Sequence, residues 1–148
     1  MMRRSLLHGI LTLAAAAAIV ALAPPGGPAR AQGADPAVTA VIDRQLDAFR
    51  AGDRNAAYAQ AAPNIQARFP NAGLFMTMVE QGYSPLIGPK ATDFLAPTPL
   101  SADRLVQPMA LIDSQGRAWR AEYAMERQAD GSWKIAGCRL IRAPDPSV

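Results

Sequence analysis

The sequence predicts an α+β fold in which N-terminal helices come before, and pack on, an antiparallel sheet. Two observations support this prediction. Apolar residues recur at helical spacing between Val38 and Val79, as they do in amphipathic helices. From Arg104 onward, apolar and polar residues alternate with the period of two of half-buried antiparallel strands. Helices followed by a run of strands are typical of the α+β class.

Residues 1–31 have the pattern of a secretory signal peptide. A positively charged start and an apolar run over residues 6–23 come before the small residues Ala29 and Ala31, the arrangement that signal peptidase recognises. We expect cleavage between Ala31 and Gln32, which gives a periplasmic or secreted protein. An uncleaved membrane anchor is the alternative, because the apolar run is nearly long enough to span a bilayer.

Residues 32–148 suffice for a single α+β domain, with its core at about residues 37–142. Of the 15 basic residues, Arg3, Arg4 and Arg30 lie in the signal segment, which leaves 12 basic against 12 acidic residues. The mature chain is therefore near neutral, and its basic residues are scattered. Neither nucleic-acid binding nor, after cleavage, membrane association is predicted.

The histidine and cysteine content excludes several chemistries. His8 is the one histidine, and it lies in the signal segment, so the mature chain has no imidazole. Triads that use serine or cysteine with histidine are excluded, as are histidine-ligated metal sites. Cys138 is the one cysteine, and we expect it to be a buried structural thiol. No metal site and no cofactor are predicted.

Capping residues and helix breakers delimit the helices. Asp35, Asp53 and Asn71 are suited to cap first turns, and Gly52 is suited to end a helix. The expected helices cover residues 36–51, 54–62 and 72–81, with a turn or short helix over residues 64–69.

Four prolines between residues 85 and 99 forbid a regular helix there, and residues 91–96 are a candidate short strand. Hairpin signals at residues 113–117 and at Asp130-Gly131 separate the later strands. Pro108 suggests an edge position or a bulge in its strand. The expected strands cover residues 104–113, 117–128 and 133–142. Cys138 would point away from the side of Ile135, unless Gly137 marks a bulge.

Three segments together carry a family resemblance. "AFRAGDRNAAYAQAAP", "FMTMVEQGYSPL" and "DGSWKIAGC" resemble the bacterial family catalogued as domain of unknown function 4864, from about Ala37 to Arg142. That family resembles the nuclear transport factor 2-like superfamily. The resemblance implies a curved antiparallel sheet wrapped around helices, forming a cone with an apolar pocket. It also implies a homodimer as one form of assembly.

The leading functional hypothesis is a non-catalytic module that binds a small apolar ligand or a protein partner. A pocket between the helices and the concave sheet face would be mostly apolar with a few polar groups, as small-molecule sites are. A purely structural role in the core is the simpler interpretation of the same side chains. The candidate lining residues are Tyr58, Phe75, Met76, Met78, Tyr83, Trp119, Tyr123 and Trp133.

A histidine-independent isomerase or lyase is the alternative hypothesis. Such an enzyme uses one carboxylate as base and a tyrosine to hold an enolate oxygen. Tyr58 or Tyr83 would be the donor, and Asp93 or Asp103 the base. A third possibility is assembly through the polar side of the sheet, which is equally well interpreted as a solvated face. Its residues are Arg120, Glu122, Glu126 and Gln128.

Overall fold

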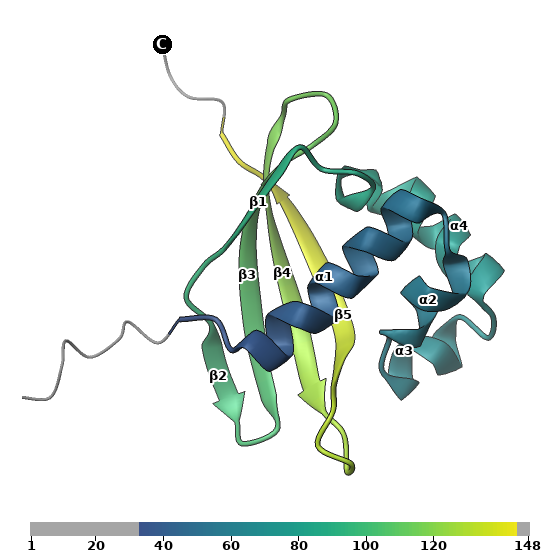
Figure 1. The fold of residues 1–148 in the computed structure, drawn as a ribbon, viewed down its shortest axis with the longest axis vertical. Coiled ribbons are helices and arrows are strands. Elements are labelled where there is room, and N and C mark those ends of the chain that lie inside the picture. Colours follow the sequence, from purple (N-terminus) through teal and green to yellow (C-terminus); the bar gives the residue numbers. More distant parts are fainter. Residues whose placement is uncertain (1–32, 145–148) are drawn as a thin grey trace, which may run out of the picture.

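The computed structural model describes residues 33–144, so the predicted signal peptide and its cleavage site lie outside the described residues. Four helices precede a five-stranded antiparallel sheet (Figure 1), and the α+β prediction is confirmed. The elements are α1 (Pro36–Ala51), α2 (Arg54–Ala59), α3 (Pro63–Arg68), α4 (Ala72–Gly82), a 3-10 turn (Ser84–Leu86), β1 (Ala91–Phe94), β2 (Thr98–Ser101), β3 (Arg104–Ile112), β4 (Ala118–Arg127) and β5 (Trp133–Arg142).

Helix α1 is bounded as its sequence predicts. The Asp35 carboxylate accepts a hydrogen bond from the Ala37 N–H at 2.8 Å, and Pro36 occupies the first turn, where its missing N–H costs nothing. Gly52 ends the helix with φ 68°, a left-handed conformation that favours glycine. The apolar side of α1 is buried against the sheet, which the helix crosses (Figure 1).

Helix α2 is shorter than predicted, because the chain leaves it to cover an edge of the sheet. After Ala59, the Gln60 carbonyl accepts from the Ile135 N–H at 2.9 Å. The Ala62 N–H then donates to the Ile135 carbonyl at 2.8 Å. This short parallel pairing satisfies backbone groups of β5 that would otherwise be open to another chain. Residues 60–62 have a high helix propensity, but these hydrogen bonds to β5 stabilise an extended conformation instead.

The sheet is curved and open, and its strand order is β1-β3-β4-β5 (Figure 1). Strand β2 also pairs with β3, on the same side as β1 but at the other end of β3. Alternate residues of β3 and β4 face the helices and form the core with α1 and α4. Strand β2 was not predicted, because Pro97 and Pro99 flank its start. An edge strand tolerates a proline whose missing N–H faces solvent.

Pro108 does not lie on an edge strand, so that part of the prediction is wrong, but it does lie opposite an irregularity of the sheet. Strand β1 pairs with residues 109–112 and β2 with residues 104–106, so the three residues 95–97 face the two residues Gln107 and Pro108. Strand β3 has neighbours on both sides, and it pairs with β4 without a register shift. The Pro108 carbonyl accepts from the Leu95 N–H at 3.0 Å, so the proline nitrogen also faces Leu95, because both groups of a residue point to one neighbour. The Gln107 side chain donates to the Leu95 carbonyl at 2.7 Å and replaces the missing proline N–H.

A bulge reorients the second half of β5. Ala124 pairs with Gly137, but the next residue of β4, Met125, pairs with Ile135, so Ala136 is the extra residue. The bulge places Cys138 on the same face as Ile135, both against the core. The sequence had left this outcome open, and the structure decides it in favour of the bulge.

Candidate functional site

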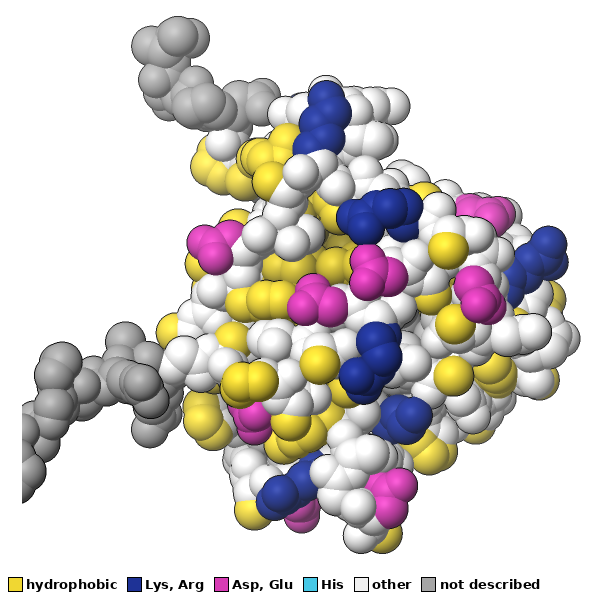
Figure 2. All heavy atoms as spheres, viewed as in Figure 1, with side chains coloured by type: hydrophobic (Ala, Val, Ile, Leu, Met, Phe, Trp, Pro, Cys, Tyr) yellow, Lys and Arg dark blue, Asp and Glu magenta, His cyan; other side chains and the backbone are white. Residues whose placement is uncertain are grey.

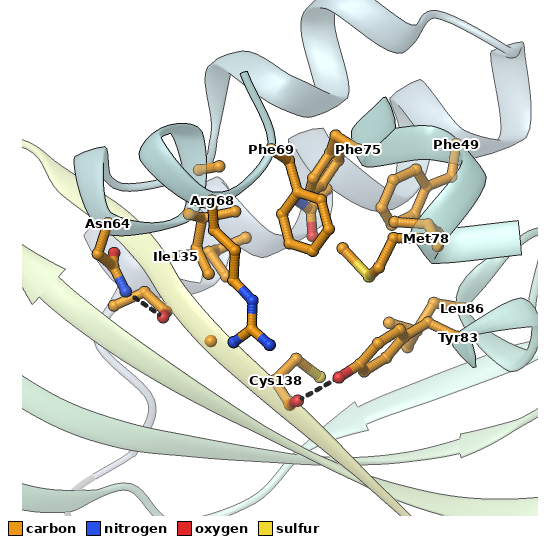
Figure 3. A pocket seen from close by; sticks show the side chains of 16 residues that line it. Phe49, Asn64, Arg68, Phe69, Phe75, Met78, Tyr83, Leu86, Ile135 and Cys138 are labelled. Carbon is orange, nitrogen blue, oxygen red and sulfur yellow. Dashed lines mark hydrogen bonds between the residues drawn. The ribbon is translucent and has the colours of Figure 1, made fainter. Parts of the chain in front are cut away.

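A cavity of about 460 Å³ lies between α3, α4 and strand β5 (Figure 3). It forms where the helices after α1 gather beside β5 instead of lying flat on the sheet (Figure 1). Its volume falls within the range of small-molecule sites. The lining residues are Gln45, Phe49, Ala61, Asn64, Ile65, Arg68, Phe69, Phe75, Met78, Val79, Tyr83, Leu86, Ile135, Ala136, Gly137 and Cys138.

Aromatic rings form the wall of the cavity on the helix side. The Phe75 ring lies at the centre of this cluster, 6.4 Å from that of Phe49, 6.5 Å from that of Phe69 and 5.6 Å from that of Tyr58. These centroid distances are those of favourable aromatic pairs. Figure 3 shows Phe49, Phe69 and Phe75 side by side above the cavity. The wall is therefore apolar and built from aromatic rings in mutual contact.

The bulged part of β5 forms the opposite wall. Its free carbonyl groups bond to side chains that frame the cavity. The Tyr83 hydroxyl donates to the Cys138 carbonyl at 3.0 Å, and the Asn64 amide donates to the Ala136 carbonyl at 2.9 Å (Figure 3). These two hydrogen bonds connect the strand to α3 and to the end of α4. They hold the two walls at a fixed separation.

The thiol of Cys138 lines the cavity but is not activated. Burial, followed by the nearby Glu122 carboxylate, raises the pKa of Cys138 to about 12. The thiol is therefore protonated at neutral pH, whereas a nucleophilic cysteine needs the thiolate. Cys138 was predicted to be buried, but it is only partly buried, because it packs against the core with one side and lines the cavity with the other.

The charge in the lining comes from Arg68. This residue ends α3, its guanidinium lies 6.0 Å from the centre of the Phe69 ring, and Figure 3 shows the side chain reaching down beside β5. None of the ion pairs formed within residues 33–144 includes Arg68. The lining contains no aspartate or glutamate. The cavity therefore combines apolar walls with one guanidinium.

Three of the residues predicted to line a pocket do line this cavity: Phe75, Met78 and Tyr83. Met76 and the other four do not. Tyr58 packs behind Phe75, and its hydroxyl donates to the Phe69 carbonyl at 2.6 Å. The Tyr58 hydroxyl is thus engaged by the backbone and does not face the cavity.

Trp119, Tyr123 and Trp133 lie elsewhere on the helix-facing side of the sheet. The Trp133 ring lies under the Arg127 guanidinium, 5.7 Å from it. Tyr123 is fully buried, and its hydroxyl and the Gln107 side-chain oxygen are the buried side-chain atoms without a hydrogen-bond partner in the described part of the chain. Burial raises the pKa of the Tyr123 phenol well above its ordinary value, so Tyr123 is not suited to proton transfer.

Trp119 belongs to a structural network at the β3–β4 turn. Its indole N–H donates to the Asp113 carboxylate at 2.9 Å, and the Arg117 side chain donates to the same carboxylate at 2.8 Å. The backbone N–H groups of Gln115 and Arg117 also donate to it. Burial raises the pKa of Asp113, but these hydrogen bonds together outweigh burial and hold that pKa well below its usual range. The network fixes the hairpin turn.

The carboxylates of the enzyme hypothesis do not reach the cavity. Asp93 is exposed on β1, and Asp103 pairs with Arg127 at 3.2 Å in a turn. Neither Asp93 nor Asp103 lines the cavity that Tyr83 lines. Among residues 33–144, no group of three histidine, cysteine, aspartate or glutamate side chains could hold a metal ion.

The polar side of β4 faces away from the helices. There Glu122 binds both Arg120 and Arg139. The Arg139 hydrogen bond, against a smaller effect of burial, lowers the pKa of Glu122. Figure 2 shows the opposite, helix-bearing face, where acidic and basic side chains are interspersed with apolar ones and form no single-charge field. Assembly through the β4 surface stays a prediction.

Asn64, Arg68, Phe69 and the bulged strand are parts of the site that the sequence did not predict. Residues 63–69 carry no distinctive motif, and their position beside β5 depends on contacts between segments more than 60 residues apart, such as Asn64 with Ala136. The Gly137 signal for a bulge was the one available indication that this strand deviates there.

Comparisons with known proteins place the chain by family alone. Residues 31–148 match the family model described as Domain of unknown function (DUF4864). No curated protein and no solved structure matches the chain. No helix within residues 33–144 has the length and apolar character that crossing a membrane requires.

Proposed function

We propose that this chain, which belongs to the family described as Domain of unknown function (DUF4864), is an exported protein that binds a small apolar molecule without transforming it. The observation that carries the proposal is the cavity of about 460 Å³ between α3, α4 and β5, with its aromatic wall. Export is supported by the signal-peptide pattern of residues 1–31.

The composition of the cavity favours binding over catalysis. Small-molecule sites are mostly apolar with a few placed polar groups, and here Tyr83 and Asn64 are held by hydrogen bonds to β5. General acid–base catalysis needs a titratable group within hydrogen-bond reach of the substrate. The lining has no carboxylate or imidazole, and the raised pKa of Cys138 keeps its thiol neutral.

We also propose that the fold is a member of the nuclear transport factor 2-like superfamily. The order of helices before a curved, open antiparallel sheet supports this. Homodimer formation and partner binding belong to the same proposal. The outer surface of β4, with its Arg120–Glu122–Arg139 cluster, is the surface on which they would be tested.

Native mass spectrometry of the protein purified after export tests ligand binding directly. We expect a mass that begins at Gln32, with a noncovalently bound small molecule. The matching solution experiment measures the fluorescence of Nile red, a neutral apolar dye. Met78→Trp fills the cavity and should abolish dye binding, whereas Leu74→Trp, on the 52 % exposed Leu74 of the same helix, should not. Equal dye binding by both variants would contradict the proposal.

A further inference from the structure

We propose that the ligand carries one negative charge, and that the cavity is built for an amphipathic monocarboxylate with its carboxylate on Arg68. This inference rests on the proposed binding function and specifies its ligand class. It starts from the charge of the lining, which includes one arginine and no acidic residue. An apolar cavity with an uncompensated cation selects a ligand that supplies the opposite charge.

The position of Arg68 supports the assignment. The side chain is exposed at the end of α3, so its guanidinium remains hydrated until a ligand arrives. Phe69 supports it from one side, at 6.0 Å from the ring centre. No ion pair within residues 33–144 competes for it. Figure 3 shows that its guanidinium reaches toward Cys138 on β5.

The chemistry of arginine narrows the anion to a carboxylate. A guanidinium presents a planar pair of N–H groups that matches a carboxylate with two parallel hydrogen bonds. A phosphate monoester carries up to two negative charges at neutral pH, whereas the lining offers one positive charge. A single carboxylate is therefore the best match in charge.

The apolar walls determine the rest of the ligand. Phe69, Phe75 and Met78 line the side of the cavity away from β5 (Figure 3), and burial of apolar surface against them supplies affinity. A volume of about 460 Å³ accommodates roughly fifteen groups of the size of a water molecule. A medium-length alkyl carboxylate such as decanoate is of this size. Arg68 would hold the head and the phenylalanines the chain.

The test compares decanoate with 1-decanol, which has the same chain and no charge. Both compete with Nile red for the exported protein at pH 7. We expect decanoate to bind at least about tenfold more tightly than the alcohol, a ratio that corresponds to about 1.4 kcal/mol. Arg68→Gln should remove this preference, so that decanoate and the alcohol bind this variant with equal affinity. Arg68→Lys should retain part of it, because the charge stays but the paired N–H groups are lost.

Arg54→Gln is the matched control. Arg54 is an exposed arginine on α2 that does not line the cavity, so this variant removes the same charge from another place. It should keep the preference for decanoate. Equal binding of decanoate and decanol by the wild-type protein would overturn the inference, and so would equal effects of Arg68→Gln and Arg54→Gln. If Nile red binds but neither compound displaces it, this inference fails and the binding function stands; if Nile red itself does not bind in the cavity, the proposed binding function fails.

Discussion

The replacement of a backbone N–H by the Gln107 side chain gives a quantitative prediction about stability. Pro108 cannot donate to the Leu95 carbonyl, and Gln107 Nε2 does so at 2.7 Å. A buried carbonyl left without a donor costs about 1–3 kcal/mol. Gln107→Leu removes this donor, but it also removes the buried Gln107 oxygen that has no partner. The change in the free energy of unfolding for Gln107→Leu therefore combines a loss, from the unpaired Leu95 carbonyl, with a gain, from removal of the unpaired Gln107 oxygen.

A double-mutant cycle isolates the hydrogen bond to Leu95. In Pro108→Ala, the new N–H at position 108 faces Leu95, because the Pro108 carbonyl already accepts from the Leu95 N–H. Gln107→Leu should then be less costly in the Pro108→Ala background than in the wild-type protein. We expect a coupling energy of about 0.5–1.5 kcal/mol, the net contribution of one hydrogen bond, because the bond between Gln107 and Leu95 is partly buried.

Urea unfolding of the wild-type protein, the two single variants and the double variant, followed by tryptophan fluorescence and circular dichroism, measures this coupling. The slope of the free energy of unfolding with urea should be the same for all four, so that they can be compared. If the two substitutions add to within about 0.4 kcal/mol, the Gln107 side chain does not replace the proline N–H, and the reasoning is wrong.

Three further predictions concern the core, the thiol and the β3–β4 turn. Phe75→Ala should lower the free energy of unfolding by about 3–5 kcal/mol, because it empties the centre of the aromatic cluster. Leu74→Ala, at an exposed site, should change the free energy of unfolding by no more than about 0.5 kcal/mol. Equal losses of stability in the two variants would contradict the central position of Phe75 in the core. Because burial raises the pKa of Cys138 to about 12, iodoacetamide at pH 8 should alkylate the native protein at least roughly a hundredfold more slowly than the unfolded one, and equal rates would show an accessible thiolate. Asp113 has a pKa below its ordinary value in the folded state, so its contribution to stability is present above about pH 4 and is lost as the pH falls below that. Asp113→Asn should lower the melting temperature at pH 7 and reduce the fall of the melting temperature below about pH 4. Asp93→Asn, at an exposed site, should leave the melting temperature and its fall in acid unchanged. If the melting temperature of Asp113→Asn falls in acid as steeply as that of the wild-type protein, the Asp113 network is not the source of that fall.

Much of the fold followed from local rules. Asp35, Asp53 and Asn71 cap helices with their side chains as predicted, because a cap needs one short acceptor and a nearby N–H. The alternation in β4 gave the buried and exposed faces correctly, because a strand side chain's direction depends on its parity. Phe75 and Met78, which were predicted as pocket residues from their type, line the cavity from α4.

The errors arose where distant segments interact. Hydrogen bonds to Ile135 determine where α2 ends. Pro108 is tolerated in a central strand because the Gln107 side-chain amide donates to the Leu95 carbonyl in place of the missing proline N–H. Tyr58 and Trp119 looked like lining residues from their type alone. The structure engages their polar groups with the Phe69 carbonyl and the Asp113 carboxylate instead.

The sequence by itself determined the helix and strand periods, the caps, the turns and the absence of histidine after residue 8, which leaves the folded domain without an imidazole. The tertiary structure alone decided where the cavity lies and that Arg68 reaches it without a carboxylate beside it. The physical reason is the range of the interactions. Periodicity and capping act over a few residues, whereas a cavity is the space left between segments that pack from far apart in the chain.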